Sequence, residues 1–334
     1  MPIKKWWWAV IIIVLLAGTV AIIHRYNANQ PQTTPIVTSN KVRIAYIPVV
    51  QALPLYITLD KGYFKEAGLD VETVKFEAPN QIIDALLSGQ VDIGAPGTAS
   101  GITAISQNKK PNSLKIFALI GGDLNTTNDE LLIKKESTFK TIADLKNKKL
   151  GILPGIQFRT IAKDILNKNG LTIDKEVQII ELAVPLQLQA LASGQIDALL
   201  TVEPVGTIGQ AKNITKELIH APMVQYISNP WYGAVGNIAV SYLDQQPDTA
   251  KKVMAIFEKT IKEINSDPNN AKLHLKNYTP LDDTLIAVTP LPIFKYHTNI
   301  STTDTESLQK FFDIFQANGV IDNKVIAEQL IYKQ

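Results

Sequence analysis

The chain contains one short segment twice, almost unchanged: Ala85-Leu86-Leu87-Ser88-Gly89-Gln90-Val91-Asp92 returns 105 positions later as Ala190-Leu191-Ala192-Ser193-Gly194-Gln195-Ile196-Asp197. Six of the eight positions are identical. In each copy an apolar helical pattern ends at a glycine, which adopts the left-handed conformation that closes many helices. An aspartate then precedes the next apolar run. The segment is typical of a helix end followed by a strand, and its recurrence predicts two related structural units.

The likeness between the two units extends toward the N-terminal side of each copy. Each unit begins with an apolar run before a proline, continues with a helical stretch closed by Gly-Leu, and reaches a second apolar run before the octapeptide. Short apolar runs that alternate with helices are typical of parallel β-α-β units. We therefore predict an α/β fold of two β-α-β-α-β lobes. The corresponding runs are Val42–Ile47 and Leu150–Leu153, then Val71–Phe76 and Val177–Leu182, with Gly68 and Gly170 at the helix ends.

Two connections are predicted to join the lobes as a hinge. The outgoing one follows the strand Leu114–Ile120 and contains Gly121 and Gly122, and the returning one contains Asn229 and Pro230. Helical patterns follow along the rest of the chain, and we expect them to pack on the first lobe. They cover residues 249–265, 270–277, 304–318 and 323–332. The predicted first lobe is thus discontinuous, at 41–123 and 229–334, and the second lobe, 124–228, is inserted into it.

An uncharged run of 18 residues, Trp6–Ile23, precedes the lobes. As a helix it would measure about 27 Å at ~1.5 Å per residue, close to the thickness of a bilayer core. Lys4 and Lys5 before it favour a cytoplasmic N-terminus. We predict a membrane anchor in residues 1–25 and a polar tether in 26–40, with a cleaved signal peptide as the alternative. Either arrangement places the lobes outside the cytoplasm.

The composition excludes several classes of function. The 33 Lys+Arg nearly balance the 31 Asp+Glu, and residues 1–40 hold three of the bases and none of the acids, so the lobes carry no basic field for nucleic acid. The chain has no cysteine, which excludes disulfides, thiolate catalysis and cysteine-based metal sites. Its four histidines are scattered, and it has no phosphate-loop motif. We therefore predict a protein that is not an enzyme and uses neither a cofactor nor a metal.

Candidate ligand contacts follow the predicted strands. In open parallel sheets, ligands bind beyond the carboxyl ends of the strands, where helix N-termini offer unpaired N–H groups. Segments after the first and third strands of each lobe meet this description, and the returning connection adds two aromatic residues. The predicted ligand-binding residues are Gln51, Gly97, Thr98, Ala99, Gly155, Gln157, Phe158, Arg159, Glu203, Trp231 and Tyr232.

The charge of the ligand stays open at this point. An anion would favour Arg159 and the helix N-termini, whereas an amine or a pyrimidine would favour Glu203 and the aromatic side chains. Each candidate also has a structural alternative. Gly97-Thr98 can cap a helix, Arg159 can pair with a surface acid, Glu203 can hold the end of a strand, and Trp231 can pack in the hinge.

Three segments resemble a known family. They are Lys61-Gly62-Tyr63-Phe64-Lys65-Glu66-Ala67-Gly68-Leu69-Asp70-Val71, then Ser88-Gly89-Gln90-Val91-Asp92-Ile93-Gly94, and Thr141–Leu150. Together they resemble the ABC-transporter substrate-binding proteins for sulfonates, nitrate, taurine and thiamine-pyrimidine precursors, over about residues 41–332. The resemblance implies a type II periplasmic-binding fold, monomeric, that closes on a small solute and delivers it to an ABC permease with a cytoplasmic ATPase. One departure is Gly155-Ile156-Gln157, where the family often has Gly-Ser or Gly-Thr for an anion.

Two other functions compete with solute uptake. A membrane-tethered module of the same fold could sense a solute and report it to a partner. The resemblance also includes enzymes of pyrimidine and menaquinone precursor synthesis. The pyrimidine-synthase type is expected to rely on a cysteine-rich motif, which this cysteine-free chain lacks, and export argues against both enzymes.

Overall fold

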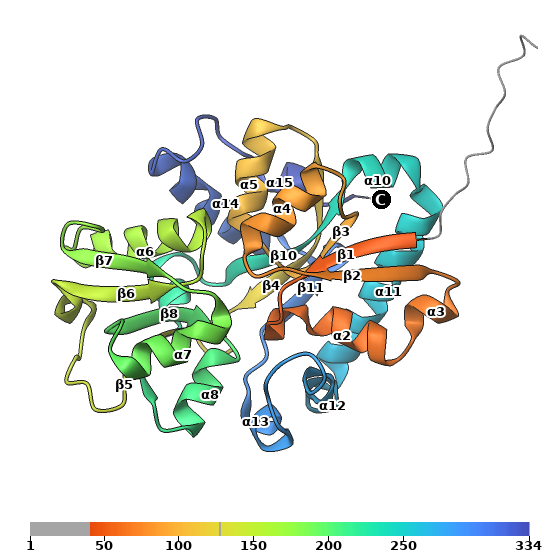
Figure 1. Cartoon of the computed structure of the whole chain (residues 1–334). Coiled ribbons are helices and arrows are strands. Elements are labelled where there is room, and N and C mark those ends of the chain that lie inside the picture. Colours follow the sequence, from red (N-terminus) through yellow and green to blue (C-terminus); the bar gives the residue numbers. More distant parts are fainter. Residues whose placement is uncertain (1–40, 127, 334) are drawn as a thin grey trace, which may run out of the picture. The chain divides into compact units, whose positions relative to one another are not determined.

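The computed structural model describes residues 41–126 and 128–333, which belong to one compact unit (Figure 1). The membrane helix predicted in residues 1–25 and the tether predicted in 26–40 lie outside the described residues. Within the described part, no helix combines the length and the apolar character that crossing a membrane requires.

Two separate sheets form the framework of this unit, as the two-lobed prediction requires. The first sheet has the order β11-β4-β10-β3-β1-β2, and the second has the order β7-β6-β8-β5-β9. The strands of the first sheet are β1 (Lys41–Tyr46), β2 (Asp70–Lys75), β3 (Ile93–Ala99), β4 (Leu114–Gly122), β10 (Trp231–Ala239) and β11 (Ile293–Tyr296). Those of the second are β5 (Asp129–Lys134), β6 (Lys148–Ile152), β7 (Val177–Glu181), β8 (Ala198–Val202) and β9 (Thr215–His220).

The repeated octapeptide has the same structural role in both sheets. In the first sheet β1 pairs in parallel with β2 and β3, and in the second β6 pairs in parallel with β7 and β8. The octapeptide glycines have φ of 73° at Gly89 and 77° at Gly194, as a left-handed helix end requires. Its aspartates then hold the neighbouring strand, because a carboxylate oxygen of Asp92 accepts the Arg43 N–H and one of Asp197 accepts the Lys149 N–H, both at 2.8 Å.

Helices cover both sheets (Figure 1). In the first lobe, α4 packs on β3, α5 on β10, and α11 on α2 and β11; in the second, α6 packs on β6 and α7 on β8. The helix α14 contacts α5 and β10 of the first lobe and also α6 of the second. The helical segments are η1 (Val50–Ala52), α2 (Leu53–Asp60), α3 (Tyr63–Glu66), α4 (Pro79–Leu87), α5 (Ser100–Lys109), η2 (Ile142–Leu145), α6 (Ile156–Lys168), α7 (Val184–Ser193), α8 (Val205–Ala211), α9 (Pro222–Tyr226), α10 (Val240–Gln245), α11 (Pro247–Ser266), α12 (Pro268–Lys272), η3 (Leu273–Leu275), α13 (Asp283–Val288), η4 (His297–Asn299), α14 (Thr302–Ala317) and α15 (Ala327–Leu330).

The two connections predicted as a hinge run side by side. The outgoing strand β4 pairs antiparallel with the returning strand β10, and Gly122 is the partner of Trp231 in this register. The backbones come so close that a Cβ at Gly121 would lie 1.7 Å from the carbonyl oxygen of Trp231. Gly121 therefore has a steric reason to be glycine. Asn229 and Pro230 immediately precede β10.

Two of the predicted helices are shorter than expected. The prediction over 323–332 is wrong for most of its length, because only Ala327–Leu330 is helical. There the chain runs along β4 instead, with a bridge between Ile116 and Ile331 and a hydrogen bond from the Tyr332 N–H to the Ile116 carbonyl. The prediction over 270–277 is divided between the end of α12 and η3.

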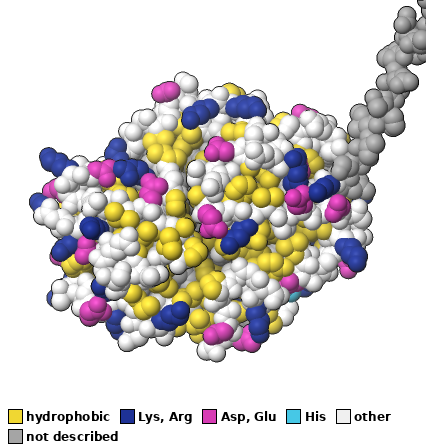
Figure 2. Space-filling view, in the orientation of Figure 1, with side chains coloured by type: hydrophobic (Ala, Val, Ile, Leu, Met, Phe, Trp, Pro, Cys, Tyr) yellow, Lys and Arg dark blue, Asp and Glu magenta, His cyan; other side chains and the backbone are white. Residues whose placement is uncertain are grey.

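Charged side chains are mixed over the face shown in Figure 2, where lysines and arginines stand among aspartates and glutamates. No broad region of one sign is visible on that face. This agrees with the near balance of acids and bases in the sequence.

Candidate ligand-binding site

A small cavity of about 50 Å³ lies between the two lobes. It has room for a few water molecules, so a ring-sized solute can enter only when the lobes move apart. Six of the eleven predicted ligand-binding residues line it, and they come from both lobes. The lining residues are Ile47, Val49, Gln51, Pro79, Gly97, Ala99, Ile120, Gly121, Asn128, Asp129, Leu153, Gln157, Phe158, Val202, Met223, Trp231, Gly233 and Ala234.

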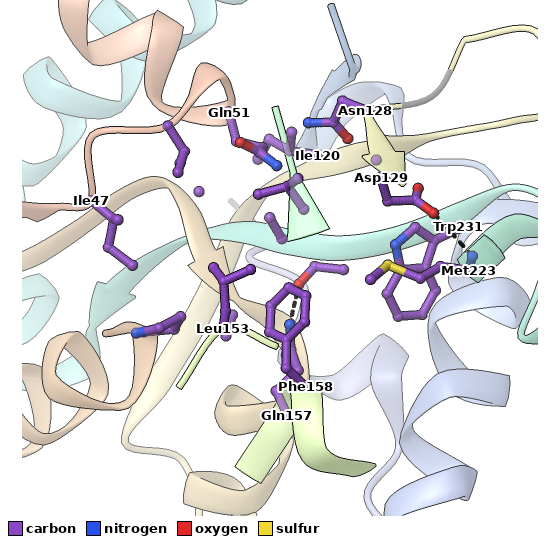
Figure 3. A pocket seen from close by; sticks show the side chains of 18 residues that line it. Ile47, Gln51, Ile120, Asn128, Asp129, Leu153, Gln157, Phe158, Met223 and Trp231 are labelled. Atoms are coloured by element: carbon purple, nitrogen blue, oxygen red, sulfur yellow. Dashed lines mark hydrogen bonds between the residues drawn. The ribbon is translucent and has the colours of Figure 1, made fainter. Parts of the chain in front are cut away.

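Three polar side chains gather on one side of this cavity (Figure 3). Gln51 lies in η1, the first element after β1, whereas Asn128 immediately precedes β5 and Asp129 is its first residue. The Oε1 atom of Gln51 and the Nδ2 atom of Asn128 are buried and have no hydrogen-bond partner among the described residues. Buried polar groups are nearly always paired in native proteins. The cavity wall therefore presents one acceptor and one donor that a bound molecule could satisfy.

Asp129 brings a carboxylate to the same wall. Its side chain is almost fully buried, with 1% of its surface exposed. One oxygen, Oδ2, accepts the backbone N–H of Met223 at 2.9 Å, which fixes the orientation of the carboxylate (Figure 3). The charged form of a buried carboxylate is stabilised by a cationic group or an N–H donor within hydrogen-bond distance.

Apolar and aromatic groups form the rest of the cavity. Phe158 and Leu153 lie opposite the polar side chains, and Trp231 and Met223 close one end (Figure 3). Trp231 is itself held by an edge-to-face contact with Phe311, whose ring centroid is 4.3 Å away. Such walls suit a flat molecule that hydrogen bonds along one edge.

The described residues that line the cavity include no lysine, arginine or histidine. Arg159 lies outside it, although the sequence singled it out as the possible partner of an anion. Its side chain is 38% exposed, pairs with Asp174, and has Glu181 at 3.9 Å. Arg159 therefore pairs with acidic side chains at the surface, which the sequence analysis gave as the alternative to ligand binding.

Four other predicted residues also lie outside the cavity lining. The hydroxyl of Thr98 donates to the Ala95 carbonyl at 3.0 Å, and the N–H of Gly155 donates to Glu181 at 3.0 Å. Tyr232 points to the opposite face of β10 from Trp231, because successive side chains of a strand alternate. Its hydroxyl donates to Asp304 at 2.6 Å.

The fourth of these residues, Glu203, belongs to a buried acidic group in the second lobe. Its carboxylate accepts the N–H of Thr207 at 3.0 Å and the hydroxyl of the same residue at 2.9 Å. Burial raises the pKa of Glu203. It raises the pKa of nearby Glu130 further, and the charges of Glu203 and Glu217 add to that effect. Glu203 thus holds the start of α8, next to the cavity wall at Val202 but not in it.

The sequence reasoning missed Asn128, Asp129 and Met223. Asn128 precedes β5 and Asp129 begins it. Because β5 is antiparallel to β8, the start of β5, and not its end, lies beside the carboxyl end of β8. A search confined to residues after parallel strands cannot find them. The available signal was the acidic pair Asp129-Glu130 directly before the apolar run Leu131-Leu132-Ile133.

Comparisons with known proteins agree with this architecture. The NMT1/THI5-like family model matches residues 50–271, which is more than half of the chain. The alkanesulfonate-binding protein SsuA from Xanthomonas axonopodis pv. citri, solved bound to MOPS, superposes with a TM-score of 0.72. That alignment covers 88% of this chain and 99% of the other at 18% identity, so it shows a shared fold. The predicted family resemblance and the two-lobed binding-protein fold are confirmed.

Two kinds of curated relative share part of the sequence. A protein of Brucella abortus (strain 2308), whose name describes a binding protein without a ligand, is 26% identical over 226 residues. The match spans 65% of this chain and 65% of the length of that relative. The 4-amino-5-hydroxymethyl-2-methylpyrimidine phosphate synthase of Aspergillus parasiticus is 29% identical over 161 residues, 48% of this chain and 44% of that enzyme.

Proposed function

Because the chain belongs to the NMT1/THI5-like family, we propose that it is a receptor that captures a small solute between its two lobes. The observation that carries the proposal is the pair of unsatisfied amide groups on the cavity wall, Gln51 Oε1 from the first lobe and Asn128 Nδ2 from the start of β5. A solute that satisfies both groups stabilises the state in which the lobes meet around it. Such closure is a population shift driven by contacts that exist only in the closed state.

The solute is uncharged or cationic and carries an N–H donor. Asp129 places a carboxylate in the wall, and the described lining residues include no cationic side chain that would neutralise an anion. Burying a sulfonate or nitrate beside a carboxylate would add like-charge repulsion to the cost of desolvation. The donor contacts Asp129 or Gln51, an acceptor on the solute contacts Asn128, and Trp231 and Phe158 cover its flat faces.

Closure is proposed to occur about the paired connections. Gly121 and Gly122 in β4, and Asn229 and Pro230 before β10, are the segments through which the chain passes between the lobes. Hinge motions are absorbed by a few residues at the ends of such elements. Of the six predicted contacts that line the cavity, Gln51, Gly97 and Ala99 come from the first lobe, Gln157 and Phe158 from the second, and Trp231 from the returning strand.

The site of action is proposed to be the outer side of a cell membrane. This rests on the uncharged run Trp6–Ile23 after Lys4 and Lys5, which suits a membrane anchor. The captured solute would pass to an ABC permease driven by a cytoplasmic ATPase, the partners that the family resemblance implies. A sensor that reports the same solute to a membrane partner would use the same cavity.

The synthase relative makes an enzyme the second candidate. The two unsatisfied amide groups on the cavity wall, one of them from the first lobe and one beside β5, favour binding of a solute. The proposed location outside the cytoplasm also favours capture.

The proposal is tested by thermal unfolding and calorimetry of the full chain with four probes: 4-amino-5-hydroxymethyl-2-methylpyrimidine, taurine, MOPS and nitrate. A bound solute at 100 times its Kd raises the free energy of unfolding by about 2.7 kcal/mol. We expect the uncharged pyrimidine to stabilise the protein, and Asp129→Asn to weaken its binding at least about tenfold, as loss of a buried charge-assisted hydrogen bond would.

Arg159→Ala is the matched control, because it removes a charged side chain outside the cavity, and it should leave the affinity within about twofold. Tight binding of MOPS or nitrate that survives Asp129→Asn would overturn the proposed ligand class. Failure of all four probes to bind would count against the receptor itself.

A further inference from the structure

The side chain of Gln157 bridges the two lobes directly. It belongs to the second residue of α6 in the second lobe and is 4% exposed. Its Oε1 accepts the N–H of Gly101 at 2.7 Å, and its Nε2 donates to the carbonyl of Gly233 at 2.9 Å. Both partners belong to the first lobe, in α5 and β10. Both polar ends of this amide are thus satisfied, unlike Oε1 of Gln51 in the same cavity.

The first lobe is shaped for this contact. A Cβ at Gly101 would lie 3.0 Å from Oε1 of Gln157 and 2.2 Å from the ring of Phe315, so glycine permits the approach. A Cβ at Gly233 would lie 2.6 Å from the indole of Trp231. Gly233 follows Trp231 by two residues in β10. The hydrogen bond from Gln157 to the Gly233 carbonyl is therefore made to the strand that carries Trp231.

The position that Gln157 Oε1 takes is one that suits an anion. Gly101 is the second residue of α5, and the first N–H groups of a helix point outward and favour negative charge. Here one of them is occupied by a neutral amide oxygen from the opposite lobe. An anionic ligand could pair with that N–H only after displacing the oxygen of Gln157, and the cavity that Gln157 lines has Asp129 as its charged residue among those described.

We propose that Gln157 is a specificity-determining clamp: it closes the lobes through its own amide and denies the N-terminus of α5 to anions. The proposal deepens the proposed function, because it explains how the same cavity selects an uncharged or cationic solute. It also predicts that part of the closed state forms before any solute binds, since both bonds of the clamp are made by the protein alone.

The clamp is tested in the full chain by single-molecule FRET between dyes on Lys109→Cys and Lys175→Cys, one exposed position in each lobe. The chain has no other cysteine, so labelling is specific. Without any added solute, Gln157→Ala should shift the ratio of open to closed molecules at least about tenfold toward open, as loss of two buried hydrogen bonds predicts. Gln157→Leu should open the lobes as well, because its side chain has a similar size but can make neither hydrogen bond.

Gln187→Ala is the matched control. Gln187 is also a buried glutamine of the second lobe, but its two bonds, to the Leu182 carbonyl at 3.0 Å and from the Thr201 hydroxyl at 2.6 Å, stay inside that lobe. It should lower the melting temperature without changing the FRET distribution. An unchanged distribution in both Gln157 variants, with melting curves showing that they are folded, would overturn the clamp.

Nitrate titration completes the test. The melting temperature of Gln157→Ala should rise with nitrate, because the Gly101 N–H is then available, whereas that of the wild-type chain should not. Equal responses of the two proteins would overturn the selectivity. The FRET result requires no ligand, so its failure would leave the receptor proposal standing, and failure of the solute screen would leave the clamp standing.

Discussion

A substitution at Tyr232 can distinguish a structural role of this residue from a ligand-binding role. The sequence places it among the ligand contacts, but the structure buries it to 1% exposure on the face of β10 away from the cavity. Its hydroxyl donates to Asp304 at 2.6 Å. The carboxylate of Asp304 also accepts Nζ of Lys295 at 2.7 Å and the hydroxyl of Ser301 at 2.7 Å. Although burial opposes it, these hydrogen bonds hold the pKa of Asp304 below its usual value.

The substitution Tyr232→Phe removes one hydrogen bond to this buried carboxylate. Bonds to charged groups contribute about 1.5–3 kcal/mol, and because Asp304 keeps Lys295 and Ser301, we expect the lower end, about 1.5 kcal/mol. That is roughly a tenfold change in the unfolding equilibrium, measurable as a shift of the urea midpoint at constant slope. Affinity for the solute that binds the wild-type chain should stay within about twofold, since no cavity group is lost.

Tyr242→Phe is the control for this prediction. The hydroxyl of Tyr242 is also buried but has no hydrogen-bond partner among the described residues. Removing an unsatisfied hydroxyl should leave stability unchanged or slightly raised. An equal loss of stability in both variants would refute the role assigned to the Tyr232–Asp304 bond. A tenfold loss of affinity in Tyr232→Phe without loss of stability would return Tyr232 to the ligand site.

Three further predictions follow from contacts elsewhere in the lobes. The pKa of Glu130 is raised by burial, so the folded state binds more protons than the unfolded state, and stability should fall as the pH rises from about 5 to about 9; Glu130→Gln should flatten this profile in urea titrations, and an unchanged profile would contradict it. Arg159→Ala should cost less than about 1 kcal/mol in the same assay, because its ion pairs are exposed; a larger loss would show that the pairs matter more than their exposure indicates. Gly121→Ala should cost about 1–3 kcal/mol or more, because its methyl would meet the Trp231 carbonyl at 1.7 Å, and a neutral result would mean that β4 and β10 separate easily.

Much of the fold was predictable because the repeated segment and its surroundings contain local sequence signals for helix ends and strands. The spacing of apolar runs, the glycines at the helix ends and the repeated aspartates depend on neighbouring residues and on one parallel strand pair in each lobe. The segment 323–332 was not predictable in this way. Its helical pattern is overruled by pairing with β4, a strand more than 200 positions earlier in the sequence.

The segments that form the site were predictable from the sequence, but not which side chains of each segment reach the cavity. Successive helix residues are turned by about 100°, so Gln157 and Arg159 cannot share a face of α6, and Gln157 is the one that reaches the cavity. The same alternation in a strand separates Trp231 from Tyr232. Asp129 was missed because its position follows from the antiparallel pairing of β5 with β8, and no local pattern reveals that pairing.

The cavity between the lobes is proposed to select an uncharged or cationic solute through Asp129. The most direct measurement is mass spectrometry of solute released by unfolding from the full chain purified under native conditions, beside the Asp129→Asn variant. We expect the wild-type chain to release one small molecule with an amine or another N–H donor, and the variant to release at most about a tenth as much. Release of a sulfonate or another anion, or equal release from both proteins, would contradict it.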